Sequence, residues 1–125
     1  QVRTRNQPKV VRKVIAGDVA KRISMMMEST TADGGTATRA RVPGFRVAGK
    51  TGTAQKVDPV TGGYSADKRV ASFVGFAPAD DPRFVMLVTI DEPQEQVYGG
   101  LVAAPVLAGV VGCSPEIQIP APQQL

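Results

Sequence analysis

The chain has 125 residues, of which 42% are hydrophobic and 21% charged, a balance typical of one globular domain. Fifteen basic and eleven acidic side chains give a net charge of +4. The absence of histidine excludes Ser-His and Cys-His mechanisms, and a single cysteine, Cys113, excludes an internal disulfide and any multi-cysteine metal site.

The start of the chain is basic and has no acidic neighbour, with Arg3, Arg5, Lys9, Arg12 and Lys13. Such an arm can attract nucleic acid or anionic lipid. Because it contains no aromatic residue and no nucleic-acid motif, we predict a solvated terminus and no nucleic-acid partner. The chain starts at Gln1 without a methionine or a signal peptide, so we expect a piece of a longer protein.

The first part of the chain predicts a short strand and a helix. Residues 8–15 favour an extended segment, and residues 17–35 favour a helix with Asp18 as its N-cap. Gly34 and Gly35 end this helix, and residues 36–40 form another turn. Helical spacing places one stripe of residues on a single face, which we expect to be core: Val19, Ile23, Met26, Met27 and Thr30.

The second part predicts three strands and a helix. A turn at residues 42–44 precedes a strand over 45–57, and a loop then leads to strands over 69–78 and 83–92, which a short link joins as a hairpin. Residues 84–90 are apolar on both faces, which predicts that both faces are covered. We predict a last helix over residues 98–112, which tolerates Pro105 only if this residue falls in the first turn. The stretch is too interrupted to cross a membrane.

The predicted order is therefore strand, helix, three strands, helix. Consecutive strands with short links favour an antiparallel sheet packed against helices, a fold of the α/β class and α+β type. Residues 1–113 make up the predicted domain portion, and residues 114–125 are a proline-spaced tail for which we predict no fixed structure.

The stretch "PGFRVAGKTGTAQKV" contains two motifs that share Lys50. Residues 44–51 satisfy the phosphate-loop pattern of nucleotide-binding proteins. Lys50-Thr51-Gly52 is the Lys-Thr-Gly signature of serine enzymes that act on D-alanyl peptides or β-lactams. The two motifs imply unrelated chemistry, so the local structure has to decide between them.

A phosphate loop needs a buried strand before Gly44 and a helix that begins near Lys50. The preceding residues are basic and interrupted by Pro43, whereas the following residues are β-branched or glycine and disfavour a helix. Asp91 is the only candidate for holding a magnesium ion. We therefore predict no nucleotide site.

As part of an extended strand, each residue of the second motif has a chemical task. Lys50 supplies positive charge to an anionic substrate and to the proton network of a serine nucleophile. Gly52 allows a substrate backbone to lie against the strand. Thr51 and Thr53 offer hydroxyls to a carboxylate, and the Thr53 N–H faces a developing oxyanion. Strict alternation places Lys50 opposite Thr51 and Thr53, so one cleft can use both faces only on an edge strand.

The surrounding sequence resembles the C-terminal part of the transpeptidase domain of class B penicillin-binding proteins, the cell-wall D,D-transpeptidases. The resemblance runs from about residue 8 to residue 111 and is carried by "GGTATRA", "VAGKTGTAQK", "ASFVGFAPADDPRFVMLVTIDEP" and "YGGLVAAPVLAGVV", in this order. It implies a partial fold of the type shared by penicillin-binding proteins and serine β-lactamases.

The resemblance also implies what the site binds. Lys50 is then catalytic, and Thr51, Gly52 and Thr53 bind the D-Ala-D-Ala stem peptide of peptidoglycan or a β-lactam that mimics it. No cofactor and no metal are implied. The location is extracytoplasmic, at the face of the bacterial cytoplasmic membrane, with a membrane anchor outside this segment.

In that family two strands from the early part of the domain pair beside the strand that here spans residues 83–91. With those strands outside this chain, the edge of the sheet is open, and we expect self-association or a need for the upstream part of the domain.

The family's nucleophile lies in a Ser-x-x-Lys motif, and a second motif reads Ser-x-Asn. Both precede Lys-Thr-Gly, so we expect this segment to contain neither and to lack the nucleophile. Two hypotheses remain: part of a catalytic transpeptidase, or a non-catalytic binding or scaffold domain that keeps the fold.

Overall fold

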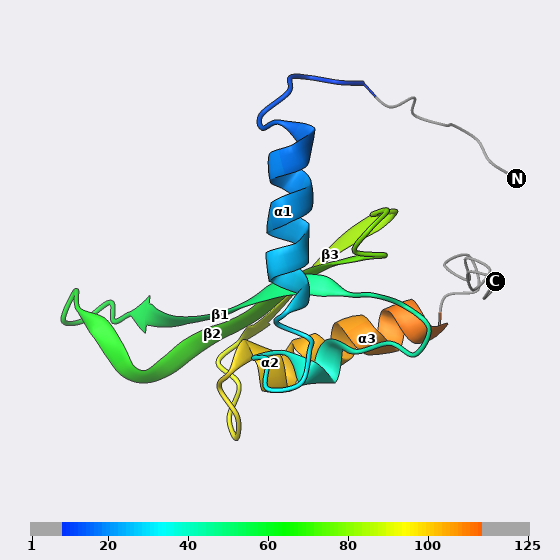
Figure 1. The fold of residues 1–125 in the computed structure, drawn as a ribbon. Helices are drawn as coiled ribbons and strands as arrows, with labels where there is room; N and C mark the ends of the chain where they lie inside the picture. The colour runs from blue at the N-terminus through cyan, green and yellow to red at the C-terminus, as the bar shows by residue number, and fades with distance from the viewer. Residues whose placement is uncertain (1–8, 114–125) are drawn as a thin grey trace, which may run out of the picture.

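The structure, a computed structural model, describes residues 9–113, which form an antiparallel sheet with helices on both faces (Figure 1). The tail predicted over residues 114–125 lies outside the described residues. The elements in chain order are α1 (Gly17–Glu28), a 3-10 turn η1 (Thr38–Ala40), β1 (Ala48–Val57), β2 (Tyr64–Ala77), β3 (Phe84–Asp91), α2 (Gly99–Val102) and α3 (Ala104–Cys113).

The sheet has the strand order β1-β2-β3, and both neighbouring pairs are antiparallel, as predicted. β1 begins later than predicted because Phe45 still belongs to the preceding turn, where its N–H donates to the Val42 carbonyl at 3.0 Å. β2 begins earlier, at Tyr64, because the Asp58 N–H closes the connecting loop on the Gly63 carbonyl at 2.8 Å.

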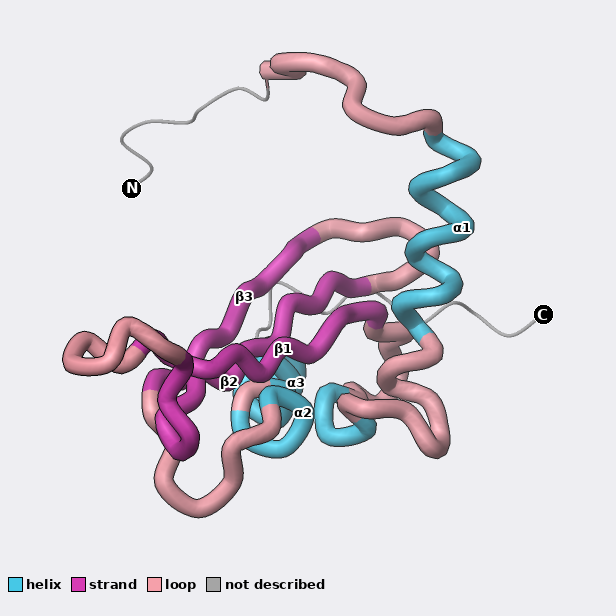
Figure 2. Tube along the Cα trace, turned by 90° about the vertical axis from the view of Figure 1, so that its left-hand side faces the viewer, coloured by secondary structure: helices cyan, strands magenta, loops and turns pink. Residues whose placement is uncertain are grey.

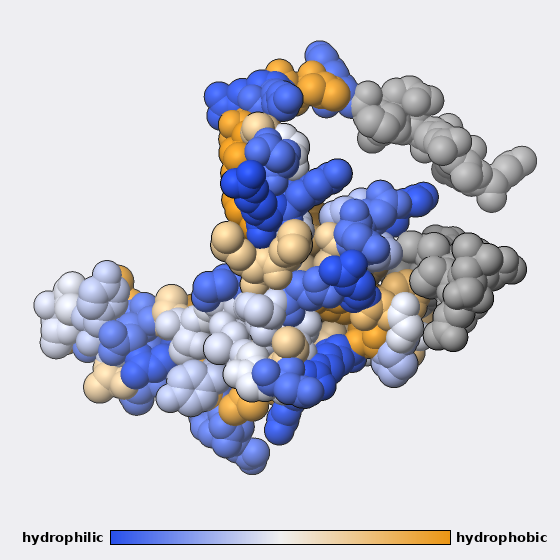
Figure 3. All heavy atoms as spheres, viewed as in Figure 1, coloured by the Kyte–Doolittle hydropathy of each residue, from blue (hydrophilic) through white to orange (hydrophobic). Residues whose placement is uncertain are grey.

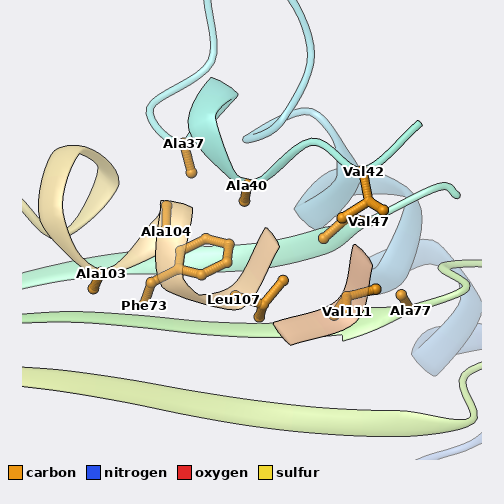
Figure 4. Packing of buried hydrophobic residues seen from close by; sticks show 10 residues of the cluster. All are labelled: Ala37, Ala40, Val42, Val47, Phe73, Ala77, Ala103, Ala104, Leu107 and Val111. Atoms are coloured by element: carbon orange, nitrogen blue, oxygen red, sulfur yellow. The ribbon is translucent and has the colours of Figure 1, made fainter. Parts of the chain in front are cut away.

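The core lies between β2 and α3 (Figure 4). Phe73 of β2 is fully buried, and Leu107 and Val111 of α3 pack over the same face of the sheet. The other elements contribute small residues to the same core cluster, among them Ala37, Ala40, Ala103 and Ala104. The core therefore sits on the face that α2 and α3 cover.

The helix predicted over residues 98–112 is divided into α2 and α3 at Ala103. Pro105 is the second residue of α3 and has no N–H to donate to the carbonyl of Leu101 one turn earlier. Arg39 supplies that donor instead, because its guanidinium donates to the Leu101 carbonyl at 3.3 Å. The division thus places Pro105 in the first turn of α3, which is the condition under which a helix tolerates proline.

The start and end of α1 differ from the prediction. Ala16 occupies the N-cap position, so Asp18 lies inside the first turn and is not the cap. The helix ends at Glu28, well before Gly34, where the N–H groups of Ser29, Thr30 and Thr31 bond to carbonyls three residues earlier. The hydroxyl oxygens of Thr30 and Thr31 also lie 2.8 and 3.0 Å from the carbonyls of Met27 and Glu28.

The prediction that α1 buries an apolar stripe is wrong. α1 projects from the sheet (Figures 1 and 2), and none of its residues is buried. Val19 and Ile23 are 40% and 42% exposed, and Met26 is 69% exposed. The helical period therefore identified an apolar face whose covering partner is not among residues 9–113. Figure 3 shows this apolar surface on the projecting part of the chain.

Two further predictions are corrected. Residues 9–16 form no strand and pair with nothing in the described part of the chain. β3 is covered on one face only: Phe84 and Met86 pack against the core, whereas Val85 and Leu87 are 71% and 66% exposed. Its apolar sequence on both faces did not reveal that one face is open.

Ion pairs fasten the C-terminal end of α1 to the sheet. Two nitrogens of Arg46, just before β1, contact both carboxylate oxygens of Glu28 at 2.7 and 2.6 Å. Arg46 also lies 3.5 Å from Asp80 in the β2–β3 connection. Hydrogen bonding to Arg46 lowers the pKa of Glu28 below its ordinary value. This cluster links the end of α1 to the start of β1 and to the β2–β3 connection.

We predict that Glu28→Gln loosens α1, because an amide cannot form the charged bidentate pair. Since the pKa of Glu28 is lowered in the folded state, its stabilising effect is present above the ordinary carboxyl pKa and is lost as the pH falls through the lowered value. Amide exchange of α1 should be faster in the variant at neutral pH, and the difference should vanish in acid.

Asp18→Asn removes the same charge from the same helix, where the nearest cation, Arg22, is 4.0 Å away, and serves as the control. Equal exchange rates in wild type and Glu28→Gln at neutral pH would contradict this role.

Candidate functional site

The Lys-Thr-Gly residues lie in the first half of β1, and the strand register shows which face each occupies. Thr51 stands opposite Phe73, whose side chain is buried beneath α3, so Thr51 and Thr53 face the α2 side. Lys50 stands opposite Val74 and lies on the α1 side. The expected separation of Lys50 from the two threonines is therefore present.

β1 is an edge strand, so both of its faces are reached from the outer edge. Near the start of the strand that edge is already occupied. Thr31 donates its hydroxyl to the Val47 carbonyl at 2.8 Å, and Thr30 donates to the Gly49 carbonyl at 3.1 Å. The main-chain N–H and C=O groups of every second residue in an edge strand point away from the neighbouring strand. The N–H and C=O of Thr51 and Thr53 therefore also point to the outer edge.

The ammonium of Lys50 reaches this outer edge from the α1 side. Its Nζ donates to the carbonyl of Thr51 at 2.8 Å, and its side chain is exposed. Among residues 9–113, Lys50 forms no salt bridge, so its charge is available to an anion. Lys50 and the two threonines thus leave opposite faces of one edge strand, and the ammonium contacts the main chain of Thr51 at its outer edge.

On the α2 side, a hollow of about 300 Å³ opens beside the two threonines. The Thr51 and Thr36 hydroxyl oxygens are 3.4 Å apart, and the Thr53 hydroxyl accepts the Gly99 N–H at 3.4 Å. The remaining lining residues are Tyr98, Gly100 and Leu101. The hollow is therefore small and hydroxyl-bearing, and two residues of β1 line it.

Glycines allow α2 to pack against the strands at this point. A Cβ on Gly99 would overlap the Ser72 carbonyl oxygen, and a Cβ on Gly100 would overlap that of Thr36. On the other face, a Cβ on Gly52 would lie 2.5 Å from the Ser72 hydroxyl. An alanine at position 52 would therefore require the Ser72 hydroxyl to rotate away.

Sequence reasoning missed Thr36 and the residues from Tyr98 to Gly100 as part of this site. The segments that contain these residues contributed to the resemblance to the transpeptidase family, but no role in the site was assigned to them. The paired glycines were the available signal, because adjacent glycines permit a close approach of two backbones. The phosphate-loop pattern is rejected as predicted: Lys50 is the third residue of a strand, and the next element is β2.

The expectation that no serine precedes a lysine by three residues is wrong, because Ser65 and Lys68 have this spacing. Both lie in β2, where alternation turns them to opposite faces. The Ser65 hydroxyl donates to Asp67 at 2.8 Å and accepts the Lys68 N–H at 3.1 Å. The Ser65 carbonyl accepts from Gln55, at the other end of β1 from Lys50. This pair is not placed to act at the hollow.

The described residues contain no group of three or more acidic, histidine or cysteine side chains that could hold a metal ion. Nor does any helix within residues 9–113 have the length and apolarity needed to cross a membrane.

Three comparisons with known proteins agree. A family model described as the penicillin-binding protein transpeptidase domain matches residues 1–112. The chain is 46% identical over 104 residues to a probable peptidoglycan D,D-transpeptidase, PenA, of Neisseria flavescens, covering 82% of this chain and 26% of that protein. The chain spans about a quarter or less of the length of the curated relatives it matches first.

Solved structures show the same relationship. The transpeptidase domain of penicillin-binding protein 3 from Burkholderia pseudomallei superimposes with a TM-score of 0.78 at 39% identity, covering 95% of this chain and 36% of that one. Penicillin-binding protein 3 from Mycobacterium tuberculosis, solved in complex with aztreonam, gives a TM-score of 0.74 at 34% identity, covering 86% and 26%.

We predict that Gly99→Ala displaces α2 from β1 and lowers the free energy of unfolding by about 1–3 kcal/mol, the usual cost of overpacking. Gly109→Ala is the matched control, since a Cβ there has nothing within 4 Å and lies inside α3. Alanine there should stabilise by about 0.5–1 kcal/mol. Thermal unfolding measures both, and a neutral or stabilising Gly99→Ala would contradict the packing described.

Proposed function

Because this chain belongs to the penicillin-binding protein transpeptidase family, we propose that it forms the β1 side of the active site of a peptidoglycan D,D-transpeptidase. The observation that carries the proposal is the position of the Lys50 ammonium on the Thr51 carbonyl, at the edge strand whose Thr51 and Thr53 line a hollow. The substrate is a stem peptide ending in D-Ala-D-Ala, and a β-lactam occupies the same place.

Each residue has a distinct role in this proposal. The hydroxyls of Thr51 and Thr53 donate hydrogen bonds to the terminal carboxylate of the substrate, and the nearby charge of Lys50 strengthens its binding. Lys50 also stabilises the deprotonated form of groups that activate the serine. Lys50 is the catalytic residue, and Thr51, Gly52 and Thr53 bind the substrate.

The outward main chain of Thr53 supports a further role in acyl transfer. A serine that attacks the peptide carbonyl creates an oxyanion, and a fixed N–H lowers its energy. The same groups would surround the carbonyl of a β-lactam as the serine attacks it and the strained ring opens. Gly52 leaves the adjacent backbone free of a side chain, so that an extended substrate can lie along β1.

The nucleophile lies outside these 125 residues in this proposal. Ser65 is the only serine followed by a lysine at the family's spacing, and its contacts bind it to β2. The complete protein therefore cross-links peptides through an acyl-serine formed by its upstream part. We place the domain outside the cytoplasmic membrane, where peptidoglycan is assembled, with an anchor elsewhere in the protein.

The alternative of a non-catalytic binding domain differs in one measurable respect. A fluorescent penicillin should label the complete protein covalently, and it should leave the 125-residue chain unlabelled at every serine. A complete protein that binds penicillin only reversibly would favour the binding domain. Labelling of the 125-residue chain at Ser65 would overturn the assignment of the nucleophile.

We predict that Lys50→Ala in the complete protein slows acylation by penicillin by at least about 100-fold, because the anionic ligand and the activated serine both lose their positive neighbour. Lys68→Ala, also in a strand and next to the other serine, should leave the rate unchanged. The second-order rate of labelling distinguishes them, and equal slowing by the two variants would remove Lys50 from the site.

Thr53→Val keeps the shape of the side chain and removes the hydroxyl. We predict a loss of about 1–3 kcal/mol in acylation, as for a charged partner left without its hydrogen bond, which is about 5- to 150-fold in rate. Thr89→Val, an exposed threonine in β3, is the control. An unchanged rate for Thr53→Val would mean that the hydroxyl contacts only the Gly99 N–H.

A further inference from the structure

Arg69 of β2 is a cation on the same face of the sheet as the threonines of β1. Residues directly opposite each other in antiparallel strands turn their side chains to one face, and the register pairs Thr53 with Ala71 and Gln55 with Arg69. Ala71 is fully buried on the α2 side, so Arg69, two residues before it, lies on that side as well. The arginine is therefore one pair beyond Thr53 in the direction of the β1–β2 connection.

The main chain brings Arg69 close to the residues of β1. The Glu92 N–H donates to the Arg69 carbonyl at 2.9 Å, so the main chain of Arg69 points to β3 and not to β1. Arg69 and Gln55 thus form a pair without mutual main-chain hydrogen bonds, in which the Cα atoms are only about 4.5 Å apart. The diagonal separation from Arg69 to Thr53 is about 7–8 Å, a distance that a long side chain spans.

The guanidinium of Arg69 has few partners of its own. Its Nη2 donates to the Ala66 carbonyl at 3.3 Å, and its Nη1 is buried with no hydrogen-bond partner among the described residues. Within residues 9–113, Arg69 forms no salt bridge. Because a guanidinium has five N–H donors in a planar fork that matches a carboxylate, donors remain for a further acceptor.

The acidic side chains near this end of β2 are bonded to other groups. Glu92 contacts the Lys56 ammonium at 2.8 Å, and Asp67 accepts the Ser65 hydroxyl at 2.8 Å. The positive charge of Arg69 is therefore not neutralised by the part of the chain that the structure describes.

The function proposed above brings a substrate to this position. The substrate lies extended along β1, with its terminal carboxylate at the Thr51 and Thr53 hydroxyls and its reacting carbonyl at the Thr53 N–H. The residues before that carbonyl lie farther along the strand, toward Gln55. Because an extended backbone advances about 3.3 Å per residue, the residue that precedes D-Ala-D-Ala reaches the level of Gln55 and Arg69.

From this placement we propose that Arg69 binds an acidic group on the residue that precedes D-Ala-D-Ala and makes the site selective for stem peptides with a carboxylate there. The inference rests on the proposed function and adds a second anion position to it. When the guanidinium turns to the ligand, it exchanges one bond of 3.3 Å for a charged bidentate pair. The acyl side chain of a penicillin occupies the same place as that residue.

Two penicillins that differ by one carboxylate test this role in the complete protein. Carbenicillin is benzylpenicillin with a carboxylate added to its acyl side chain. Arg69→Gln should lower the second-order rate of acylation by carbenicillin about 10-fold relative to that by benzylpenicillin, as expected for a lost hydrogen bond between charged groups. Arg69→Lys should retain part of the selectivity, because it keeps the charge and loses the fork.

Lys68→Gln is the matched control, because it removes one positive charge from the adjacent residue of β2. The Lys68 ammonium lies 3.8 Å from Glu92, and the ratio of the two rates should not change. Lys50→Ala should slow both penicillins, since it acts on the carboxylate that they share.

The outcomes separate this inference from the proposed function. An Arg69→Gln variant that slows both penicillins equally, or neither, would overturn the role of Arg69 and leave the proposed function intact. A complete wild-type protein that neither penicillin acylates would contradict the proposed function, and the inference with it.

A crystal structure of the complete wild-type protein acylated by carbenicillin tests the contact without a variant. The carboxylate of the acyl side chain should lie within about 3 Å of a guanidinium nitrogen of Arg69. A carboxylate turned to solvent, or an Arg69 paired with an acidic residue of the upstream part of the domain, would overturn the inference.

Discussion

The position of β1 at the edge of the sheet is the constraint on which the site depends. A strand turns successive side chains to opposite faces, so Lys50 cannot share a face with Thr51 and Thr53. With strands on both sides of β1, the two groups would lie in separate layers. With β2 on one side only, the lysine reaches the free edge, where its ammonium bonds to the Thr51 carbonyl.

The neighbouring elements keep that edge in place and leave only part of it free. The hydroxyls of Thr30 and Thr31, just after α1, each lie between one of the last carbonyls of that helix and an outward carbonyl of Val47 or Gly49 at the start of β1. The paired glycines at the start of α2 bring that helix against the strands from the other side. Local helix termination, sheet pairing and the shape of the hollow are therefore consequences of a few short contacts.

Much of this was accessible from the sequence. Alternating and apolar runs predicted the three strands and their antiparallel order, and Pro43 with the following glycine predicted the turn before β1. Proline and β-branching around Lys50 were enough to reject a phosphate loop, since a helix could not begin there. These signals are local, so they can be interpreted without knowledge of the tertiary structure.

The failures have a different origin. The apolar stripe of α1 and the apolar outer face of β3 were assigned to a core. An apolar pattern indicates that a surface can be covered, but it does not show whether the covering segment lies within the same 125 residues. The start of α1 depended on which residue leaves the helical backbone, and Asp18 does not. The hollow joins Thr36, Thr53 and Tyr98 from distant segments, and no local pattern shows that they meet.

The central claim is that the ligand lies against the outer edge of β1. A crystal structure of the complete protein acylated by a β-lactam tests it most directly. The account predicts a ligand carboxylate within about 3 Å of the Thr51 and Thr53 hydroxyls, the distance of a charge-assisted hydrogen bond, with the Lys50 ammonium beside it. A ligand bound without contact to these three residues would contradict it.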